Sequence, residues 1–218
     1  MRVALIGGTG DIGAGLALRL AILGHEIYVG SRKEEKAVTK CEEYHECVVD
    51  FKSNCTFVGM SNEVAAKEGE ISILTIPWKH AFSTAEELQE PLKDKIVVSP
   101  IVPMRKEGGC FQFCPPESGS AAEKLASVLN QSIVVSAFHT IPADKFFDLN
   151  ANFEWDVPVC GDDEGAKLEV MDLIDQIKGL RPLDAGPLTA SRMVESITPL
   201  IVNIMVRNKL KDLGIRFC

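Results

Sequence analysis

The chain begins with a short apolar stretch that leads at once into closely spaced glycines. Residues 1–6 (MRVALI) suit a buried strand, and Gly8, Gly10 and Gly13 then form the pattern Gly-x-Gly-x-x-Gly. Between a strand and a helix, the first glycine of this pattern permits a tight turn, the second lets a pyrophosphate approach the backbone, and the third lets the helix pack closely. The helix N-terminus supplies the positive end of its dipole. The opening of the chain therefore predicts a dinucleotide-binding α/β domain.

The second predicted strand indicates which dinucleotide is bound. In NAD-selective sites an Asp or Glu follows about 20 residues after the glycines and accepts a hydrogen bond from the ribose 2′-hydroxyl. Here the strand at 27–30 is followed by Ser31, Arg32 and Lys36, with no acid directly after it. A hydroxyl and a guanidinium suit a 2′-phosphate, which a carboxylate would repel. We therefore predict NADP; the alternative is that Arg32 and Lys36 are solvated charges balanced by Glu34 and Glu35.

Apolar segments and helical patterns alternate along most of the chain. This alternation predicts a doubly wound parallel sheet with helices on both faces, the Rossmann arrangement. The segments 47–55 and 105–118 contain Gly, Pro and Cys without periodicity and are predicted loops. The predicted strands are 1–6, 27–30, 56–59, 71–76, 96–99 and 133–137, and the predicted helices are 11–23, 33–46, 62–67, 80–92 and 120–129.

Two units are expected, a dinucleotide-binding domain at 1–150 and a smaller C-terminal α/β domain at 151–218. The second would contain a strand at 156–160 and a helix at 164–178. The last predicted helix, 191–209, is apolar on several faces and should be kinked by Pro199. A helix of this kind packs between domains or against a second subunit, so we expect a homodimer.

Composition excludes several classes of function. The net charge of −8 argues against a nucleic-acid or membrane-surface partner. The apolar run 197–206 is too short to span a bilayer. Seven cysteines, an odd number without a Cys-x-x-Cys pair, and a start unlike a signal peptide indicate free thiols in a reducing cytoplasm. Because no His stands near Cys110 and Cys114, no metal site is expected.

The ends of the predicted strands are mostly apolar and poor in acids and bases. Ligands of open parallel sheets bind at these ends. A short-chain dehydrogenase would need Tyr-x-x-x-Lys, but Tyr28 and Tyr44 are followed four residues later by Arg32 and Val48. His139 stands at a strand end without an evident acidic partner. Such a site suits hydride transfer between two bound coenzymes, in which the protein orients the two rings and excludes water.

Motifs along nearly the whole chain resemble the archaeal NADP reductases that depend on the deazaflavin coenzyme F420. The later motifs are more specific than the glycine turn, which many families share. The resemblance implies reversible hydride exchange between NADP(H) and F420 in a methanogen-like archaeal cytoplasm. The motifs are GGTGDIG (7–13), GSRKEEK (30–36), LTIPW (74–78), KIVVSP (95–100), HTIPA (139–143), WDVPVCGDD (155–163), GLRPLDAGPL (179–188) and LGIRF (213–217).

The resemblance also implies roles for individual residues, with no side chain acting as a catalytic acid or base. Asp11 departs from the family pattern, where a neutral Asn is expected, and its carboxylate would repel the pyrophosphate unless it caps the helix and points away. Residues Thr9, Gly10, Asp11 and Ile12 would hold the pyrophosphate, Ser31, Arg32 and Lys36 the 2′-phosphate, and Ile76, Val102 and Ala143 would line the nicotinamide side, with His139, a possible orienting residue, and Leu213 beside the deazaflavin.

Two alternatives remain open at this stage. One is a non-catalytic NADP sensor that controls a partner through the apolar last helix. The other is a small NADPH-dependent imine or keto-acid reductase, a class that shares a terminal helical dimer unit. Four cations near the last helix could attract the anionic tail of the deazaflavin, although a solvated helix end is the more ordinary reading; they are Arg192, Arg207, Lys209 and Lys211.

Overall fold

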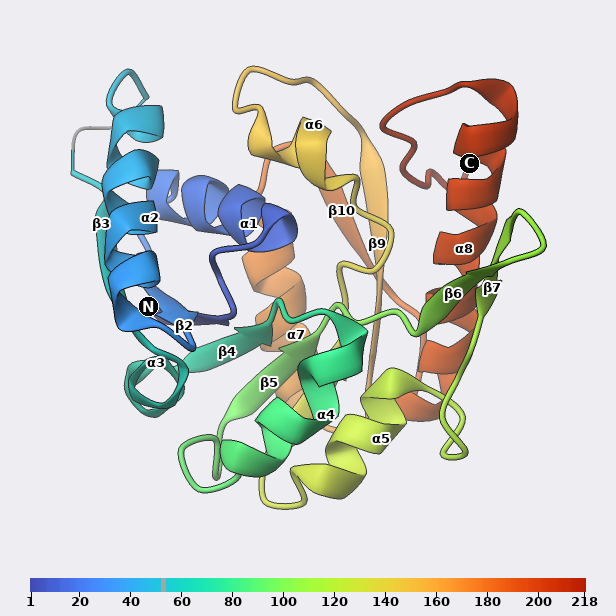
Figure 1. The fold of residues 1–218 in the computed structure, drawn as a ribbon, viewed down its shortest axis with the longest axis horizontal. Helices are drawn as coiled ribbons and strands as arrows, with labels where there is room; N and C mark the ends of the chain where they lie inside the picture. Colours follow the sequence, from blue (N-terminus) through green and yellow to red (C-terminus); the bar gives the residue numbers. More distant parts are fainter. Residues whose placement is uncertain (52–53) are drawn as a thin grey trace.

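A computed structural model describes residues 1–51 and 54–218, and it contains an eight-stranded sheet in the order β10-β9-β8-β5-β4-β1-β2-β3 (Figure 1). The six strands from β8 to β3 run parallel to one another. The predicted doubly wound parallel sheet is therefore confirmed. The strands are β1 (Arg2–Ile6), β2 (Glu26–Ser31), β3 (Thr56–Ser61), β4 (Ile71–Leu74), β5 (Ile96–Ser99), β8 (Ile133–Ser136), β9 (Trp155–Gly161) and β10 (Leu180–Asp184).

Two apolar layers cover the sheet, one on each face. In β1, Val3 and Leu5 join one layer, whereas Ala4 and Ile6 join the other, as the alternation of side chains along a strand requires. The first layer includes α1 (Asp11–Ile22), α2 (Glu34–Val48), α6 (Ala143–Phe147) and α7 (Glu164–Asp175). The second includes α3 (Asn62–Glu68), α4 (Trp78–Glu87) and α5 (Ala121–Val128).

The segment predicted as a loop at 105–118 contains a β-hairpin, so this prediction was wrong. Strands β6 (Met104–Glu107) and β7 (Cys110–Phe113) pair antiparallel around Gly108 and Gly109, both with positive φ. Only a short stretch of the hairpin is apolar, which hid its strand character. The other predicted loop, 47–55, includes residues 52 and 53, which lie outside the described residues.

Beyond residue 150 the chain returns to the same sheet. Strand β9 pairs antiparallel with β8, with Ser136 opposite Cys160, and β10 pairs parallel with β9. The strands of the expected C-terminal unit thus extend the sheet of the N-terminal unit and are continuous with it.

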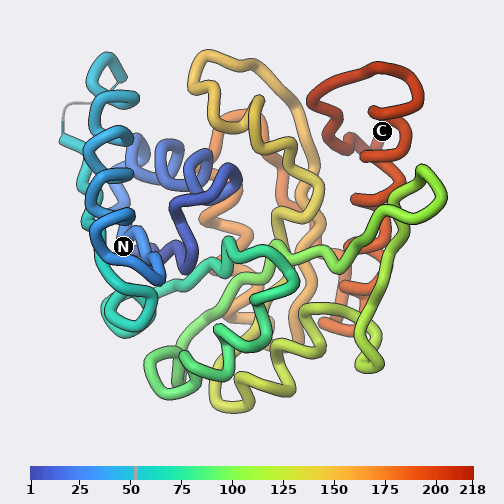
Figure 2. Tube along the Cα trace, viewed as in Figure 1, coloured from blue at the N-terminus to red at the C-terminus, as the bar shows by residue number. Residues whose placement is uncertain are grey.

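The last helix, α8 (Ser191–Asn208), follows a short 3₁₀ turn (Leu188–Ala190) and packs beside β7 and α5. Several of its apolar side chains are exposed, so the helix is not buried on several sides within one chain. Figure 2 shows α8 at the opposite end of the molecule from α2. Its exposed apolar residues are Met193, Leu200, Ile204 and Val206. No helix within the described ranges has the length and apolar character needed to cross a membrane.

The C-terminal segment is attached to β9 through the buried side chain of Asp156. Its carboxylate accepts hydrogen bonds from Arg181, from Arg216 and from the backbone N–H of Phe217. The backbone N–H of Asp156 also donates to the carbonyl of Ile215 at 2.7 Å. Because a buried carboxylate needs such partners, these contacts hold the last residues against β9, the strand next to the edge strand β10.

Candidate functional site

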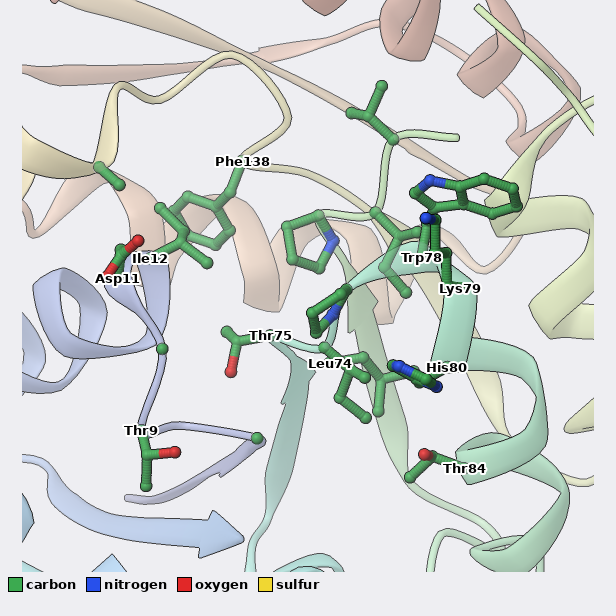
Figure 3. Close-up of a pocket in the computed structure, with 18 of the residues that line it drawn as sticks. Thr9, Asp11, Ile12, Leu74, Thr75, Trp78, Lys79, His80, Thr84 and Phe138 are labelled. Carbon is green, nitrogen blue, oxygen red and sulfur yellow. The ribbon is translucent and has the colours of Figure 1, made fainter. Parts of the chain in front are cut away.

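A cleft of about 1460 Å³ runs along the carboxyl ends of β2, β1, β4, β5 and β8. Figure 3 shows Thr9 and Asp11 on one side of it and Trp78, Lys79 and His80 on the other, with Leu74 and Thr75 between. Eleven of the thirteen predicted site residues line this cleft: Thr9, Gly10, Asp11, Ile12, Ser31, Arg32, Lys36, Ile76, Val102, His139 and Ala143. The carboxyl edge of an open parallel sheet is where a nucleotide is expected to bind.

The glycine turn is built by Gly7 and Gly8 together. Gly7 has the positive φ of 75°, and its N–H donates to Oδ1 of Asn62 at 3.1 Å. Gly8 lies behind the cleft, where a Cβ would come 2.7 Å from Cβ of Leu5. Its carbonyl accepts a hydrogen bond from the buried Tyr44 hydroxyl at 2.9 Å. Gly8 is therefore a packing residue of the turn and does not line the cleft.

The start of α1 leaves room for a phosphate group. A Cβ on Gly10 would meet nothing nearer than the carbonyl oxygen of Gly7 at 3.8 Å, so the cradle is open. Gly10 is also the N-cap of α1, and no side chain caps this helix end. The N–H groups of its first turn thus remain available to an anion. Asp11 lies exposed in that first turn and lines the cleft, so its carboxylate does not act as the cap.

The end of the cleft beside β2 is cationic. Arg32, Lys33 and Lys36 line it with exposed side chains, and none of them takes part in an ion pair within the described part of the chain. The Ser31 hydroxyl is buried and accepts the N–H of Lys33 at 3.2 Å, which leaves its own proton to donate. Three cations and a hydroxyl at the end of the second strand match the chemistry of a 2′-phosphate.

The middle of the cleft is apolar and built by the ends of β4 and β5. Ile76 and Pro77 follow β4, and Pro100, Ile101 and Val102 follow β5. The prolines fix φ in these segments, so the walls are held in place. Such aliphatic walls suit a flat ring and exclude water from it.

His139 borders the cleft as a buried, neutral imidazole. Its Nε2 lies 3.3 Å from the Ser136 hydroxyl, and Nδ1 has no hydrogen-bond partner among the described residues. Burial lowers the pKa of His139 to about 3. Phe138, which precedes it, has a positive φ of 67°, and the Thr198 hydroxyl on α8 donates to the His139 carbonyl at 2.9 Å. The unpartnered Nδ1 is a polar atom that a bound group could satisfy.

Leu213, unlike the other predicted residues, does not line the cleft; it lies in the C-terminal segment. Some residues that the sequence did not indicate do line the cleft, including Asn62, Lys79, Arg105, Phe111 and Thr198. Asn62 and Lys79 follow strand ends, a position that could have marked them. Arg105, Phe111 and Thr198 come from the hairpin and α8, and no local pattern relates these elements to the strand ends.

The four cations near α8, for which solvated side chains were the more ordinary expectation, are also absent from the lining of the cleft described above. Arg207 instead donates to Sγ of Cys110 at 2.9 Å. The described residues likewise contain no group of three or more His, Cys, Asp or Glu side chains that could hold a metal ion.

The doubly wound sheet, the open glycine turn and the cationic end beside β2 together define a dinucleotide-binding protein of the oxidoreductase type. Residues 2–103 match the family model described as NADP oxidoreductase, coenzyme F420-dependent. The chain is 43% identical to the F420-dependent NADP reductase of Methanocaldococcus jannaschii, over 99% of this chain and 97% of the relative. It therefore belongs to the family of F420-dependent NADP reductases.

A second relative agrees with this assignment, and a solved structure agrees with the fold. The F420-dependent NADP reductase of Methanothermobacter marburgensis is 34% identical over 99% of this chain and 97% of its own length. A crystal structure of a candidate F420-dependent NADP reductase from Arthrobacter sp. FB24 superposes with a TM-score of 0.82, covering 99% of this chain and 98% of that one. At 21% identity, the latter supports the fold alone.

Proposed function

We propose that this protein catalyses reversible hydride transfer between NADP(H) and coenzyme F420. The observation that most supports this proposal is a single continuous cleft. It has a cationic end suited to an anion, an apolar middle, and further space beside His139 that a second ring could fill. The full-length similarity to reductases of that name points to the same pair of coenzymes.

NADP would occupy the half of the cleft beside β1 and β2. The turn from Thr9 to Ile12 would bind the pyrophosphate through the N–H groups at the start of α1, with the Asp11 carboxylate as an opposing charge. The Gly10 N–H itself donates to the Gly7 carbonyl at 3.3 Å, so Gly10 contributes open space and no donor. Ser31, Arg32 and Lys36 would bind the 2′-phosphate, and Ile76, Val102 and Ala143 would line the nicotinamide ring.

The deazaflavin would lie beyond the ends of β5 and β8, beside His139. The low pKa of His139 keeps its imidazole neutral at physiological pH, so it can orient a bound ring by hydrogen bonding without adding a charge. Residues 151–218 would act as the smaller unit that closes this side, and Leu213 would reach the ring only if the C-terminal segment moves toward the cleft.

When both coenzymes are bound, they supply the redox chemistry, a hydride exchanged between two planar rings. The contribution of the chain is to position these rings against each other and to keep water away. Ile76, Pro100 and Val102 provide the dry wall, and no acid or base has to act.

The test is to mix the purified protein anaerobically with NADPH and oxidised F420 in one cuvette. We expect the deazaflavin absorbance to fall while NADPH is consumed, with NADH far less effective. An unchanged spectrum contradicts the proposal. Binding of NADPH without its consumption would indicate a sensor, and oxidation of NADPH only with an imine or keto acid would indicate the alternative reductase.

A homodimer in the cytoplasm also forms part of the proposal. The exposed apolar side chains of α8 support a second copy as the partner, since such a surface is costly in water. Six free thiols favour a reducing compartment: Cys41, Cys47, Cys110, Cys114, Cys160 and Cys218.

A further inference from the structure

The cleft has a second cationic region that the NADP assignment leaves unused. Lys79 follows the end of β4 at the start of α4, and Arg105 and Lys106 lie on β6. All three line the cleft, together with His80, and all have exposed side chains. Figure 3 shows Lys79 and His80 across the cleft from Thr9 and Asp11. Lys79 therefore lies away from the phosphate-binding turn, and so does β6, which Figure 1 shows on the side of α8 and away from α1.

Acids do not neutralise this second region. Among the described residues that line the cleft, Asp11 is the one acid, and it belongs to the opposite side. Arg105 forms an ion pair with Glu107 at 2.9 Å, but both side chains are more than half exposed, so the pair is weak. Lys106 lies over the ring of Phe111 at 5.9 Å from its centroid, which leaves its charge unpaired. The region keeps a net positive charge.

The β6–β7 hairpin that presents these cations is fixed from both sides. Trp78 Nε1 donates to the Met104 carbonyl at 3.1 Å, which ties the hairpin to α4. Asn203 on α8 accepts the N–H of Phe111 and donates to its carbonyl, each at 2.7 Å. Lys106 pairs with Phe111 across the hairpin. Arg105 and Lys106 therefore lie on a hairpin that hydrogen bonds fix to α4 and α8, and not on a free loop.

Along the cleft, a cationic region is followed by an apolar region and then by a second cationic region. In the proposed function, Arg32 and Lys36 bind the anionic end of NADP, and the apolar walls contact the rings of both coenzymes. The cations at the hairpin are then suited to a second anionic group. Coenzyme F420 carries such a group, because its deazaflavin ring is extended by a phosphodiester and by glutamate carboxylates.

Resting on the proposed function, we propose that Lys79, Arg105 and Lys106 bind the phosphodiester and carboxylate tail of F420. They thereby select the coenzyme over a deazaflavin that lacks the tail. The two coenzymes lie with their charged ends at opposite ends of the cleft and their rings in the apolar middle. Multiple cations facing a flexible polyanion give charge-assisted contacts that weaken with added salt.

The experiment compares F420 with its tail-less 8-hydroxy-5-deazariboflavin precursor as hydride acceptors at saturating NADPH. The double variant Arg105→Gln/Lys106→Gln and the single variant Lys79→Gln are measured beside the wild type. We expect kcat/KM for F420 to fall about tenfold in the double variant, mainly through KM, and its salt dependence to flatten. The value for the tail-less acceptor should stay within about twofold.

Lys93→Gln serves as the matched control, because Lys93 is an exposed cation away from the cleft lining. Equal losses with both acceptors, no loss with either, or a raised KM for NADPH would each overturn the tail assignment. A wild-type enzyme that turns over neither deazaflavin would instead refute the proposed function, so the two failures are distinguishable. Thermal unfolding of each variant, expected to match the wild type, shows that the fold is kept.

Discussion

Asp11 places a negative charge beside the turn that is proposed to bind a pyrophosphate. Its side chain is exposed, lines the cleft and does not cap α1. We predict that Asp11→Asn strengthens NADPH binding about two- to fivefold, because an exposed like-charge contact costs up to about 1 kcal/mol. Fluorescence titration of NADPH measures the change.

Glu90→Gln is the control for this prediction, since it removes an exposed acid outside the cleft lining. Weaker binding in Asp11→Asn would show that the carboxylate assists the site, for example by ordering the turn. A gain of equal size in both variants would assign the effect to net charge.

Arg32 offers a guanidinium to the 2′-phosphate at the other end of the turn. We predict that Arg32→Ala weakens NADPH binding on the order of ten- to hundredfold, the range expected when hydrogen bonds to a charged group are lost. NADH, which lacks that phosphate, should be almost unaffected. Titration of both nucleotides checks this, with Lys93→Gln, outside the cleft lining, as the control. Equal weakening of both nucleotides would refute the 2′-phosphate assignment.

At the residue scale, local spacing in the sequence was sufficient to predict which residues of the glycine turn and the second strand line the cleft. Thr9, Gly10 and Arg32 follow directly from the glycine pattern and the second strand. The bond from Gly7 to Asn62 and the bond from the Thr198 hydroxyl to the His139 carbonyl depend on how distant segments meet in space. Nothing in the local sequence indicates such pairings.

Between elements, the contact between α8 and α5 depends on a buried carboxylate. Glu195 is fully buried, and its two oxygens accept the N–H groups of Ala121 and Ala122 at 2.9 and 3.1 Å. Burial outweighs these hydrogen bonds and raises the pKa of Glu195 to about 7. The folded protein therefore binds a proton that the unfolded chain releases near pH 4.5. This contribution to stability is complete below that pH and is lost as the pH rises through 7.

We predict that Glu195→Gln removes this dependence. Wild type should lose roughly 3 kcal/mol of stability relative to the variant between pH 4.5 and 7.5, from a pKa raised from 4.5 to about 7. His139 acts in the opposite sense, because its pKa is lowered to about 3 and its contribution is lost as the pH falls below 6.5. The difference between the two proteins is thus the informative quantity.

Urea unfolding followed by circular dichroism at several pH values measures that difference. The variant should gain stability as the pH rises from 4.5 to 6.5 and then level off. Wild type should stay nearly level to pH 6.5, because the Glu195 and His139 contributions oppose each other, and should decline slightly up to about pH 7. Parallel curves for the two proteins would mean that Glu195 does not titrate in this range.

At this scale, the predicted helices and the six parallel strands agree with the structure because each has a clear apolar period. The ends of elements were less certain. Helix α4 ends at Glu87 and not at Leu92, since Leu88 already departs from helical ψ. The hairpin at 104–113 was missed because its residues Arg105, Lys106 and Glu107 are exposed and charged. Their strand conformation depends on the bonds to Trp78 and Asn203.

For the whole molecule, the exposed face of α8 determines the expected assembly. We predict that Leu200→Glu/Ile204→Glu converts a dimer into a monomer, because charges replace two apolar side chains at the proposed interface. Analytical ultracentrifugation over a range of concentrations measures this. Leu168→Glu, an exposed apolar residue on α7, is the control and should leave the dimer intact. A wild-type protein that sediments as a monomer at all concentrations would refute the dimer.

The overall architecture was predictable up to β8, because strands and helices alternate along this part of the chain and such alternation forms a parallel sheet. The direction of β9 was not, since a strand has the same sequence pattern whether it pairs parallel or antiparallel. The antiparallel pairing with β8 follows from the connection through α6, which turns the chain back at the cleft.

The attachment of Asp156 has a consequence for the order in which the protein can mature during synthesis. Arg216 lies 60 residues later in the chain, so β9 leaves the ribosome well before that counter-charge exists. Until then the carboxylate stays hydrated or depends on Arg181 alone. Strand β9 and the C-terminal segment should accordingly be the last parts to fold stably, and a nascent chain paused before residue 216 would expose β9 to chaperones and proteases.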